Sequence, residues 1–424
     1  MRISIRSYGS PPRTSADSMP LPILTIRDVV ETQLCCGCGA CAGVAPDRFR
    51  MVDAPELGRR PVALNGSAHG GDDGAAFRVC PGRALSHGDR LSEPGLLPDL
   101  IPGWGPVRAV WEGFAADDEA RFGGSSGGAA TALGLYALEQ ANMHGVLHTR
   151  ADPERPVFNQ TTMSRSRAEL LAGAGSRYAP ASPCEGLPMI EAAPGPCVFV
   201  GKPCDVAGAV NAAAERPALA KNLGMTIAFF CAGTPSTRGT IELLKKVGVR
   251  SPADVKSLRY RGHGWPGRWT VVHELDGEER EASLSYEESW GFLQRYRQWR
   301  CYICPDHTGE FADIAVGDPW YRPVQDGEPG KSLIVARTER GLAFVNAAAA
   351  AGYLTLETQD ATLLPRSQPN LLSTRGRLWG QLAALRLAGV PTPRFQGFES
   401  FQWWKQLPLK AKGQSTLGTL KRIG

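Results

Sequence analysis

The sequence predicts an α/β fold for most of the chain, with a small cysteine-rich module before it, so that the whole is α+β. Two observations predict this. Between about residues 107 and 358, apolar runs of strand length alternate with Ala- and Leu-rich stretches of helical length, which is typical of a mainly parallel sheet. Five of the eleven cysteines fall within residues 26–92, in a Gly- and Asp-rich setting with little periodicity.

The elements of the α/β part follow from apolar periodicity and from helix-ending residues. The strands are expected within residues 108–116, 196–203, 225–233 and 312–320. The helices are expected at residues 130–142, 238–248 and 343–352, the second of them ending at Gly248.

A chain of 424 residues exceeds one core of usual size, so several units are expected. Four prolines between Glu93 and Pro106 indicate a linker. We therefore predict a flexible arm (1–25), the cysteine module (26–92), the linker (93–106), the α/β domain (107–358) and a C-terminal extension with a basic aromatic tail (359–424).

Composition limits the functional classes. The net charge is +5, and no acidic residue follows Glu399 while five basic residues do, so the rest of the chain is neutral and no nucleic-acid surface is expected. The longest apolar runs have strand length, and no signal peptide is recognised, so a cytoplasmic protein is expected. The tail suits either an anionic membrane surface, as at the inner face of a membrane, or a helix packed on its own domain.

Cys35, Cys38 and Cys41 have the C-x2-C-x2-C spacing by which bacterial ferredoxins hold an iron–sulfur cluster. The expected fourth cysteine is replaced by Ala45, which precedes Pro46. Cys80 is also followed by proline, and we expect it to be the displaced fourth ligand. A three-iron cluster and a zinc knuckle remain alternatives.

A second group of cysteines is spread along the α/β part. Cys204 and Cys231 each follow a predicted strand, and the carboxyl ends of neighbouring parallel strands face one crevice. Cys301 and Cys304 form a C-x2-C pair, so the four thiols could hold one metal cluster. Cys184 and Cys197 lack such company and are interpreted as structural thiols.

A Gly- and Ser-rich loop, "GGSSGG", directly precedes the predicted helix at 130–142. Free amides at a helix N-terminus attract phosphate, and glycine allows close approach, although a flexible loop before a core helix is the alternative. Arg177 and Lys202 are candidate anion partners, and Tyr178 is a candidate stacking ring. The segment "RYRGHGWPGRW" suits a loop over a planar cofactor, with His263 as a weak candidate proton donor.

These segments occur in an order that resembles the beta-subunit family of coenzyme F-420 (deazaflavin) hydrogenases and dehydrogenases, which includes plant 7-hydroxymethyl chlorophyll a reductase. The resemblance rests on "CCGCGACAGVAP", "SGGAATALGLYALE", "GSRYAPASP", "VGKPCDVAGA", "FFCAGTPS", "YRGHGWPGR" and "CYICPDHTGEFADIAVGDPW". It covers about residues 34–320, roughly two thirds of the chain.

The resemblance implies an iron–sulfur flavoprotein with a ferredoxin-like module, an FAD-binding α/β domain and two 4Fe-4S clusters, the N-terminal one 3Fe-4S in the alternative. Cys204, Cys231, Cys301 and Cys304 would then ligate the cluster near the flavin, and Cys35, Cys38, Cys41 and Cys80 the outer one. The FAD site would be lined by Ser126, Gly127, Gly128, Thr131, Ser176, Arg177, Tyr178 and Lys202.

The implied function is an oxidoreductase that passes electrons between a hydride carrier, such as coenzyme F-420 or another small-molecule substrate, and one-electron carriers. A ferredoxin or another electron-transfer protein is the implied partner. Relatives with similar tails occur beside polysaccharide-assembly genes, which suggests reduction of a glycan or lipid-linked intermediate. The alternative is a non-catalytic electron-relay or zinc-stabilised subunit of a larger complex.

Overall fold

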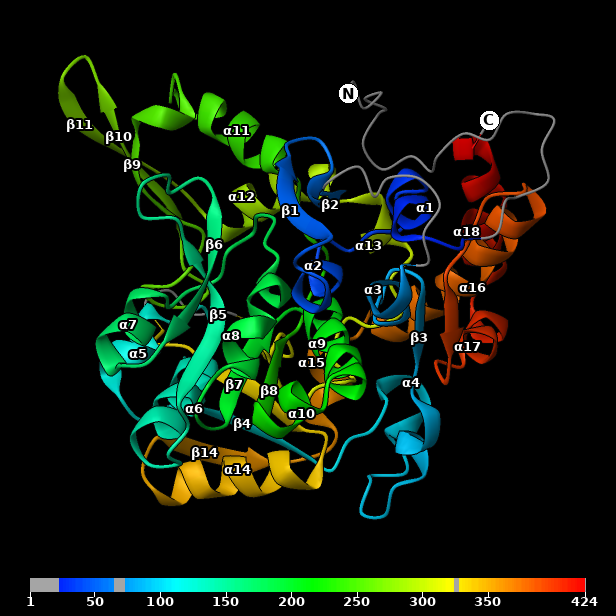
Figure 1. Ribbon diagram of the computed structural model, residues 1–424, viewed down its shortest axis with the longest axis horizontal. Coiled ribbons are helices and arrows are strands. Elements are labelled where there is room, and N and C mark those ends of the chain that lie inside the picture. Colours follow the sequence, from blue (N-terminus) through cyan, green and yellow to red (C-terminus); the bar gives the residue numbers. More distant parts are fainter. Residues whose placement is uncertain (1–22, 65–72, 324–327, 424) are drawn as a thin grey trace.

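The computed structural model describes residues 23–64, 73–323 and 328–423, so most of the predicted N-terminal arm lies outside the described residues (Figure 1). Its centre is a sheet of eight strands. In spatial order these are β14 (Leu354–Gln359), β4 (Ala109–Ala115), β13 (Ser332–Ala336), β12 (Ile314–Gly317), β8 (Leu223–Phe229), β7 (Cys197–Gly201), β5 (Gly145–Ala151) and β6 (Asn159–Ser164).

This sheet is mixed, so the α/β class is confirmed but the prediction of a mainly parallel sheet is wrong. Only the neighbours β12–β8, β8–β7 and β7–β5 are parallel, and the remaining pairs of the sheet are antiparallel. Parallel neighbours need a crossover, usually a helix. No helix lies in the described part of the β12–β13 connection, and β13 returns antiparallel beside β12.

The other strands form three smaller sheets. The hairpin of β1 (Phe49–Ala54) and β2 (Gly58–Ala63) lies in the N-terminal part. A separate antiparallel sheet consists of β9 (Val255–Arg259), β10 (Trp269–Leu275) and β11 (Glu278–Leu284). Far apart in the chain, β3 (Ala84–Ser86) and β15 (Arg394–Gln396) pair in parallel.

The helices lie around these sheets (Figure 1). Before the centre of the chain they are α1 (Ile26–Glu31), α2 (Ala40–Val44), α3 (Gly74–Arg78), α4 (Ile101–Trp104), α5 (Asp118–Gly123), α6 (Ala129–Glu139), α7 (Arg167–Ala172), α8 (Leu187–Glu191), α9 (Pro203–Glu215) and α10 (Pro217–Asn222). After it they are α11 (Thr237–Lys246), α12 (Tyr286–Leu293), α13 (Trp299–Tyr302), α14 (Glu339–Ala350), α15 (Leu363–Ser367), α16 (Leu371–Leu387), α17 (Ser400–Gln406) and α18 (Leu409–Ile423). Short 3₁₀ turns are η1 (Gly88–Ser92), η2 (Pro183–Gly186), η3 (Pro252–Asp254) and η4 (Gln294–Tyr296).

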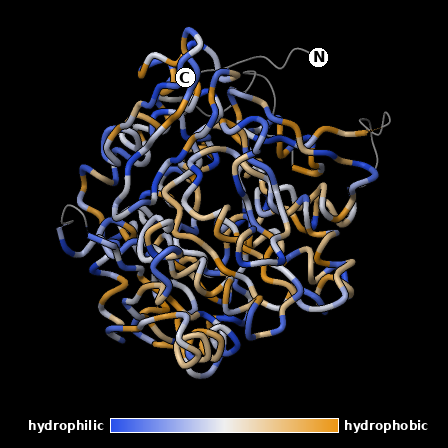
Figure 2. Tube along the Cα trace, turned by 90° about the vertical axis from the view of Figure 1, so that its left-hand side faces the viewer, coloured by the Kyte–Doolittle hydropathy of each residue, from blue (hydrophilic) through white to orange (hydrophobic). Residues whose placement is uncertain are grey.

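The large sheet is buried on both faces, and apolar residues therefore run almost continuously along its central strands. In β7, Val198 and Val200 contact the core under α6 and α14, whereas Phe199 contacts the opposite core under α8 and α9. This alternation builds three layers, and apolar segments concentrate in the interior (Figure 2). The predicted strands β4, β7, β8 and β12 and the predicted helices α6, α11 and α14 are all present.

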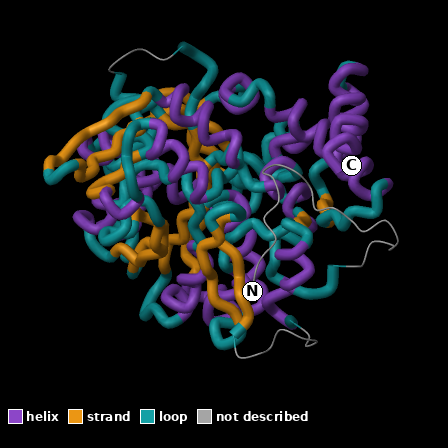
Figure 3. Tube along the Cα trace, turned by 90° about the horizontal axis from the view of Figure 1, so that it is seen from above, coloured by secondary structure: helices purple, strands orange, loops and turns teal. Residues whose placement is uncertain are grey.

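The C-terminal helices α16, α17 and α18 form a bundle at one edge of the molecule, away from the long strands (Figure 3). Helix α16 packs through Leu378, Leu382 and Leu385 on the N-terminal loop at Leu34 and Cys35. The extension that begins at residue 359 is therefore largely helical, and it covers part of the cysteine module.

A buried ionic network joins the N-terminal part of the chain, the α/β part and helix α16. His87 Nε2 lies 2.9 Å from Glu310 Oε2, and Arg375 of α16 pairs with the other carboxylate oxygen of Glu310. Burial acts to raise the pKa of Glu310, but Arg375 and His87 outweigh it and hold that pKa at about 2. The carboxylate is thus ionised, which is how a buried charge is tolerated.

Candidate functional site

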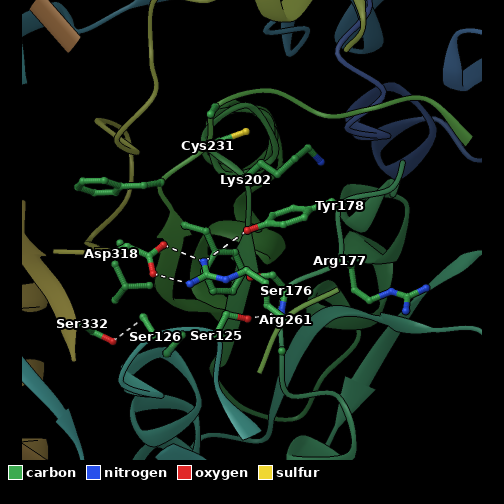
Figure 4. A pocket seen from close by; sticks show the side chains of 18 of the residues that line it. Ser125, Ser126, Ser176, Arg177, Tyr178, Lys202, Cys231, Arg261, Asp318 and Ser332 are labelled. Carbon is green, nitrogen blue, oxygen red and sulfur yellow. Dashed lines mark hydrogen bonds and ion pairs between the residues drawn. The ribbon is translucent and has the colours of Figure 1, made fainter. Parts of the chain in front are cut away.

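A cavity of about 630 Å³ lies at the carboxyl ends of the parallel strands β5, β7, β8 and β12 (Figure 4). This is where open α/β sheets bind ligands, because the loops that follow neighbouring strands face one crevice. Its volume is in the range of small-molecule and cofactor sites. The sequence placed candidate residues in these loops, and the structure brings most of them together.

The Gly- and Ser-rich loop forms one wall of this cavity. Ser126, Gly128 and Thr131 line it, and no side chain caps the N-terminus of α6. Gly128 has φ +72°, and a Cβ there would lie 2.9 Å from the Arg121 Cα, so only glycine fits without strain. Gly127 instead packs on β13, where its N–H donates to Ser332 Oγ over 2.9 Å.

The segment 173–181 forms the next wall, with Ser176, Arg177 and Tyr178. The Ser176 N–H donates to Ser125 Oγ over 2.6 Å, which ties this wall to the glycine loop. The Arg177 guanidinium points away from the cavity (Figure 4), donating to Asn159 Oδ1 and to backbone carbonyls. Its side chain therefore orders the wall instead of presenting its donors to the cavity.

Arg261 lines the cavity, as Arg297 does, and the sequence analysis singled out neither of them. Arg261 pairs with Asp318 at 2.7 Å, and its Nη1 lies 3.4 Å from the Tyr178 hydroxyl (Figure 4). The guanidinium carbon lies 4.8 Å from the centre of the Tyr286 ring, and Trp320 borders the same space. The sequence did contain a signal for Arg261, because it is the second arginine of "RYRGHGWPGRW", the segment that suggested a loop over a cofactor.

His263 does not line this cavity. Its ring is exposed and stacks on Phe122, with ring centres 5.0 Å apart, and its backbone N–H donates to the Phe122 carbonyl. Two described histidines, His148 and His307, do line the cavity, and His307 contacts the Cys231 carbonyl through Nδ1 at 2.9 Å. Burial lowers the pKa of His307, which favours the neutral ring.

Lys202, at the turn from β7 into α9, places its ammonium against the cavity wall. Its Nζ lies 2.6 Å from Asp205 Oδ2. Burial acts to lower the pKa of Lys202, but Asp205 and the nearby thiols of Cys204 and Cys231 raise it overall, so the lysine is charged. Burial raises the pKa of Asp205 in turn. The result is a partly buried cation between the larger cavity and the cysteines.

The second cysteine group meets in a smaller cavity beside the first. It is lined by Cys204 in the first turn of α9, Cys231 after β8, Cys301 in α13 and Cys304 just after that helix. The structure thus brings together the four cysteines that the sequence grouped, and their role as ligands remains a prediction. Backbone amides point at two of the sulfurs: Gly233 N–H at Cys231 Sγ and Thr234 N–H at Cys301 Sγ, both over 3.4 Å. The two cavities share one wall, made of Cys231, Gly233, Thr234 and His307.

Cys36 also lines this smaller cavity, which the sequence did not reveal. Its contact with Cys204, followed by burial, raises the pKa of the Cys204 thiol well above its ordinary value. Cys36 belongs to the N-terminal loop, so it brings the two cysteine groups next to each other.

The first cysteine group also comes together. Burial raises the pKa of Cys41, as do the neighbouring thiols Cys35, Cys38 and Cys80. Burial likewise raises the pKa of Cys80 to about 12. The loop bends at Gly37 and Gly39, with φ +71° and +85°, and the Gly37 N–H donates to Cys35 Sγ. The distant Cys80 therefore lies near the other thiols of this group, and its role as a fourth ligand remains a prediction.

The two remaining cysteines differ from each other. Cys184 lies beside Cys38, and this contact lowers the pKa of Cys38. Cys197 lies in β7 with its thiol directed at the Gly195 carbonyl.

Within the described residues, no three His, Cys, Asp or Glu side chains are arranged to hold a single metal ion.

Arg300 lies between the two cysteine groups with its side chain buried. It donates to the Ile303 carbonyl over 3.0 Å and to the Pro81 carbonyl, next to Cys80, over 3.3 Å, while its Nε has no partner. It also lines the smaller cavity. One buried cation therefore faces the second cysteine group and Cys36, and it also binds the carbonyl that follows Cys80 in the chain.

Comparison with known proteins shows which protein family the chain is similar to. Residues 110–187 match the family described as coenzyme F-420 hydrogenase/dehydrogenase, beta subunit N-term, and residues 196–362 match the corresponding C terminus. The chain is similar to the coenzyme F-420 hydrogenase subunit beta of Methanococcus voltae, with 26% identity over 68% of this chain and 99% of that protein. It is also similar to the F-420-dependent formate dehydrogenase 1 subunit beta of Methanococcus maripaludis, with 27% identity over 54% of this chain and 57% of that protein.

A chain of the F-420-reducing [NiFe] hydrogenase complex from Methanosarcina barkeri shares the fold, with a TM-score of 0.50 and 20% identity over 69% of this chain and 96% of that chain. No described helix is both long and apolar enough to span a membrane. Because the two family matches together cover more than half of the chain, the protein belongs to the beta-subunit family of coenzyme F-420 hydrogenases and dehydrogenases.

Proposed function

We propose that this oxidoreductase subunit is an iron–sulfur flavoprotein that exchanges electrons between a hydride carrier and one-electron carriers. The observation that carries the proposal is the wall shared by the two cavities. A ligand in the larger cavity and a metal cluster in the smaller one would be separated by little more than Cys231 and His307. That arrangement suits a hydride-accepting cofactor coupled to a one-electron centre.

The residues of the larger cavity fit FAD. The uncapped N-terminus of α6 and the glycine loop supply amides for phosphate, and Arg261 supplies a cation. Tyr286, Trp290 and Trp320 supply aromatic surface for a planar ring. When bound, a flavin can take two electrons as hydride and release them singly. The protein's part is to orient it against the Cys231 wall and to keep Lys202 protonated beside it.

The two cysteine groups fit clusters of the 4Fe-4S type. Cys204, Cys231, Cys301 and Cys304 supply four thiols in a buried cavity, and amides directed at sulfur are typical of iron–sulfur sites. Cys35, Cys38, Cys41 and Cys80 supply a second set, for which a three-iron cluster without Cys80 is the alternative. Burial raises the pKa of Cys80 and Cys231 to about 12, and neighbouring thiols act in the same direction, so metal binding would have to release the protons of these two thiols.

The relatives are named as subunits of F-420-linked hydrogenases and dehydrogenases, which supports coenzyme F-420 as the hydride carrier. A ferredoxin or another electron-transfer protein is the proposed one-electron partner, in the cytoplasm. A glycan or lipid-linked substrate, in polysaccharide biosynthesis, is the other proposed acceptor. A non-catalytic relay or zinc-stabilised subunit is the alternative that the test below separates.

The test uses the full chain, reconstituted anaerobically with iron, sulfide and FAD. Reduced coenzyme F-420 is supplied as the two-electron donor and a viologen dye as the one-electron acceptor, so each donor molecule reduces two dye molecules. We expect Cys231→Ser to lose at least about tenfold in dye reduction, since removing one thiol ligand disables a cluster. The matched control Cys197→Ser should retain it, because that thiol lies in β7 apart from both groups. Equal losses in both variants, or no turnover by the parent protein, would contradict the proposal.

A further inference from the structure

Helix α18 packs on the other helices of the bundle with its small and polar face, and its leucines lie on the exposed face. Its buried residues are Ala411, Ser415 and Thr419, the last two only 3% and 1% exposed. Its leucines face solvent: Leu409 is 84% exposed, Leu417 61% and Leu420 36%. Amphipathic helices of globular proteins normally bury their large apolar residues and expose the polar ones. This helix does the reverse.

The reversed orientation is fixed by close packing. The Ser415 hydroxyl donates to the Lys412 carbonyl and the Thr419 hydroxyl to the Ser415 carbonyl, both over 2.8 Å, so the buried hydroxyls are satisfied within the helix. Opposite Ser415, α16 has Gly380, where even an added Cβ would collide with the Ser415 hydroxyl. A leucine has no room on that face, so the leucines of α18 are held outward.

The three leucines lie on one side of α18. Leu409 and Leu420 are eleven residues apart, about three helical turns, and Leu417 lies between them on an adjoining row. We call Leu409, Leu417 and Leu420 the leucine face. Lys410 and Lys421 are exposed along one border of it.

The charge of this region has one sign. No acidic residue follows Glu399, whereas Lys405, Lys410, Lys412, Lys421 and Arg422 do. A second copy of the chain would bring the same lysines together with no carboxylate from the helix to pair with them. An anionic lipid surface supplies both an apolar layer for the leucines and negative charge for the lysines.

The bundle also lies at the edge of the molecule (Figure 3), and the family match ends at residue 362, before α16 begins. The leucine face is therefore an addition outside the matched region. We propose that the leucine face of α18 docks this protein on anionic membrane surfaces, with the helix lying in the lipid–water interface. This inference stands apart from the proposed electron transfer and needs no cofactor.

The experiment is co-sedimentation of the full chain with vesicles of phosphatidylcholine alone or with added phosphatidylglycerol. We expect binding to the anionic vesicles, weakened by salt. The double variant Leu417→Gln/Leu420→Gln should bind at least about tenfold more weakly, because two apolar side chains no longer enter the bilayer. Lys410→Gln should weaken binding about fivefold.

Met189→Gln is the matched control, since Met189 is an exposed apolar side chain of α8, outside the C-terminal bundle. It should bind as the parent protein does, and thermal melts of all variants should coincide because the leucine face has no partner among the residues that the structure describes. Absence of binding to anionic vesicles, or equal binding by the leucine variant, would overturn the proposal. So would a dimer that the leucine variant converts to monomer, because a second copy would then cover this face.

Discussion

At the scale of single residues, Arg300 is the side chain whose position says most about the cysteine groups. It is a buried cation that donates to carbonyls and lies over the Phe395 ring, and no carboxylate in the described structure pairs with it. A thiolate-bound cluster gains negative charge on reduction, and a nearby cation stabilises that charge. Arg300 is thus a positioning residue for the cluster proposed at Cys204, Cys231, Cys301 and Cys304, and the spacing of the cysteines does not show this role.

We predict that Arg300→Gln lowers the reduction potential of the cluster proposed at Cys204 by roughly 50–150 mV, the effect of one buried charge at an effective dielectric constant of about 20. The measurement is a redox titration followed by electron paramagnetic resonance. Arg300→Lys should restore most of the shift. Arg295→Gln, an exposed arginine nearby, should leave the potential unchanged because water and salt screen it. An unchanged potential in Arg300→Gln would contradict this role.

His148 gives a pH dependence at the same scale. The ring is buried beside the larger cavity, with Nε2 2.7 Å from Ser164 Oγ, and burial lowers its pKa from 6.5 to about 4. Since the folded protein holds this histidine neutral, its contribution to stability is complete above pH 6.5 and is lost as the pH falls through 4.

The loss amounts to about 3 kcal/mol of unfolding free energy. Urea denaturation across this pH range should show it in the parent protein and show a flatter profile in His148→Asn. His144→Asn, on a partly exposed ring, serves as the control and should follow the parent. A parallel profile for His148→Asn would show that another group causes the acid destabilisation.

At the scale of elements, the start of α6 depends on one backbone conformation. Gly128→Ala would place a Cβ against the carbonyl of Ala120 at φ +72°, so we expect a loss of about 1–3 kcal/mol in unfolding free energy and weaker retention of FAD. Gly291→Ala is the matched control, since that site in α12 has open space around it. It should stabilise the protein by about 0.5–1 kcal/mol. Both changes are measurable by denaturation, and equal effects would refute the packing argument.

The elements also show what sequence reasoning could and could not recover. Strands β7 and β8 and helices α6 and α14 carry strong local patterns, and all were predicted. Strand β13 is apolar as well, but its place between β4 and β12 is set by pairing with distant strands, which no local pattern encodes. The sequence also did not predict which face of α18 is buried. Its leucines and lysines are compatible with either orientation, and the close contact between Gly380 and Ser415 decides between them.

At the scale of the whole molecule, distant parts of the chain converge on the candidate site. The loop at Cys35 and Cys36, the turn at Cys204 and the pair at Cys301 and Cys304 come from separate regions, and α16 covers the first of them. The sequence grouped the thiols from the C-x2-C spacings, from the proline after Cys80 and from the places of Cys204 and Cys231 after predicted strands. It missed Arg261, Arg300 and Cys36, because their roles depend on which elements pack together. The proposed domain boundaries remain predictions.

The most direct test of the central claim, that this subunit carries FAD and two clusters, is anaerobic purification of the full chain with iron, sulfide, zinc and flavin quantified per chain, alongside the visible spectrum. We predict about eight irons, equal sulfide and one FAD, or about seven irons if the outer cluster has three. Iron without flavin would support the alternative, in which the protein is only an electron relay. Zinc without iron or flavin would contradict the account.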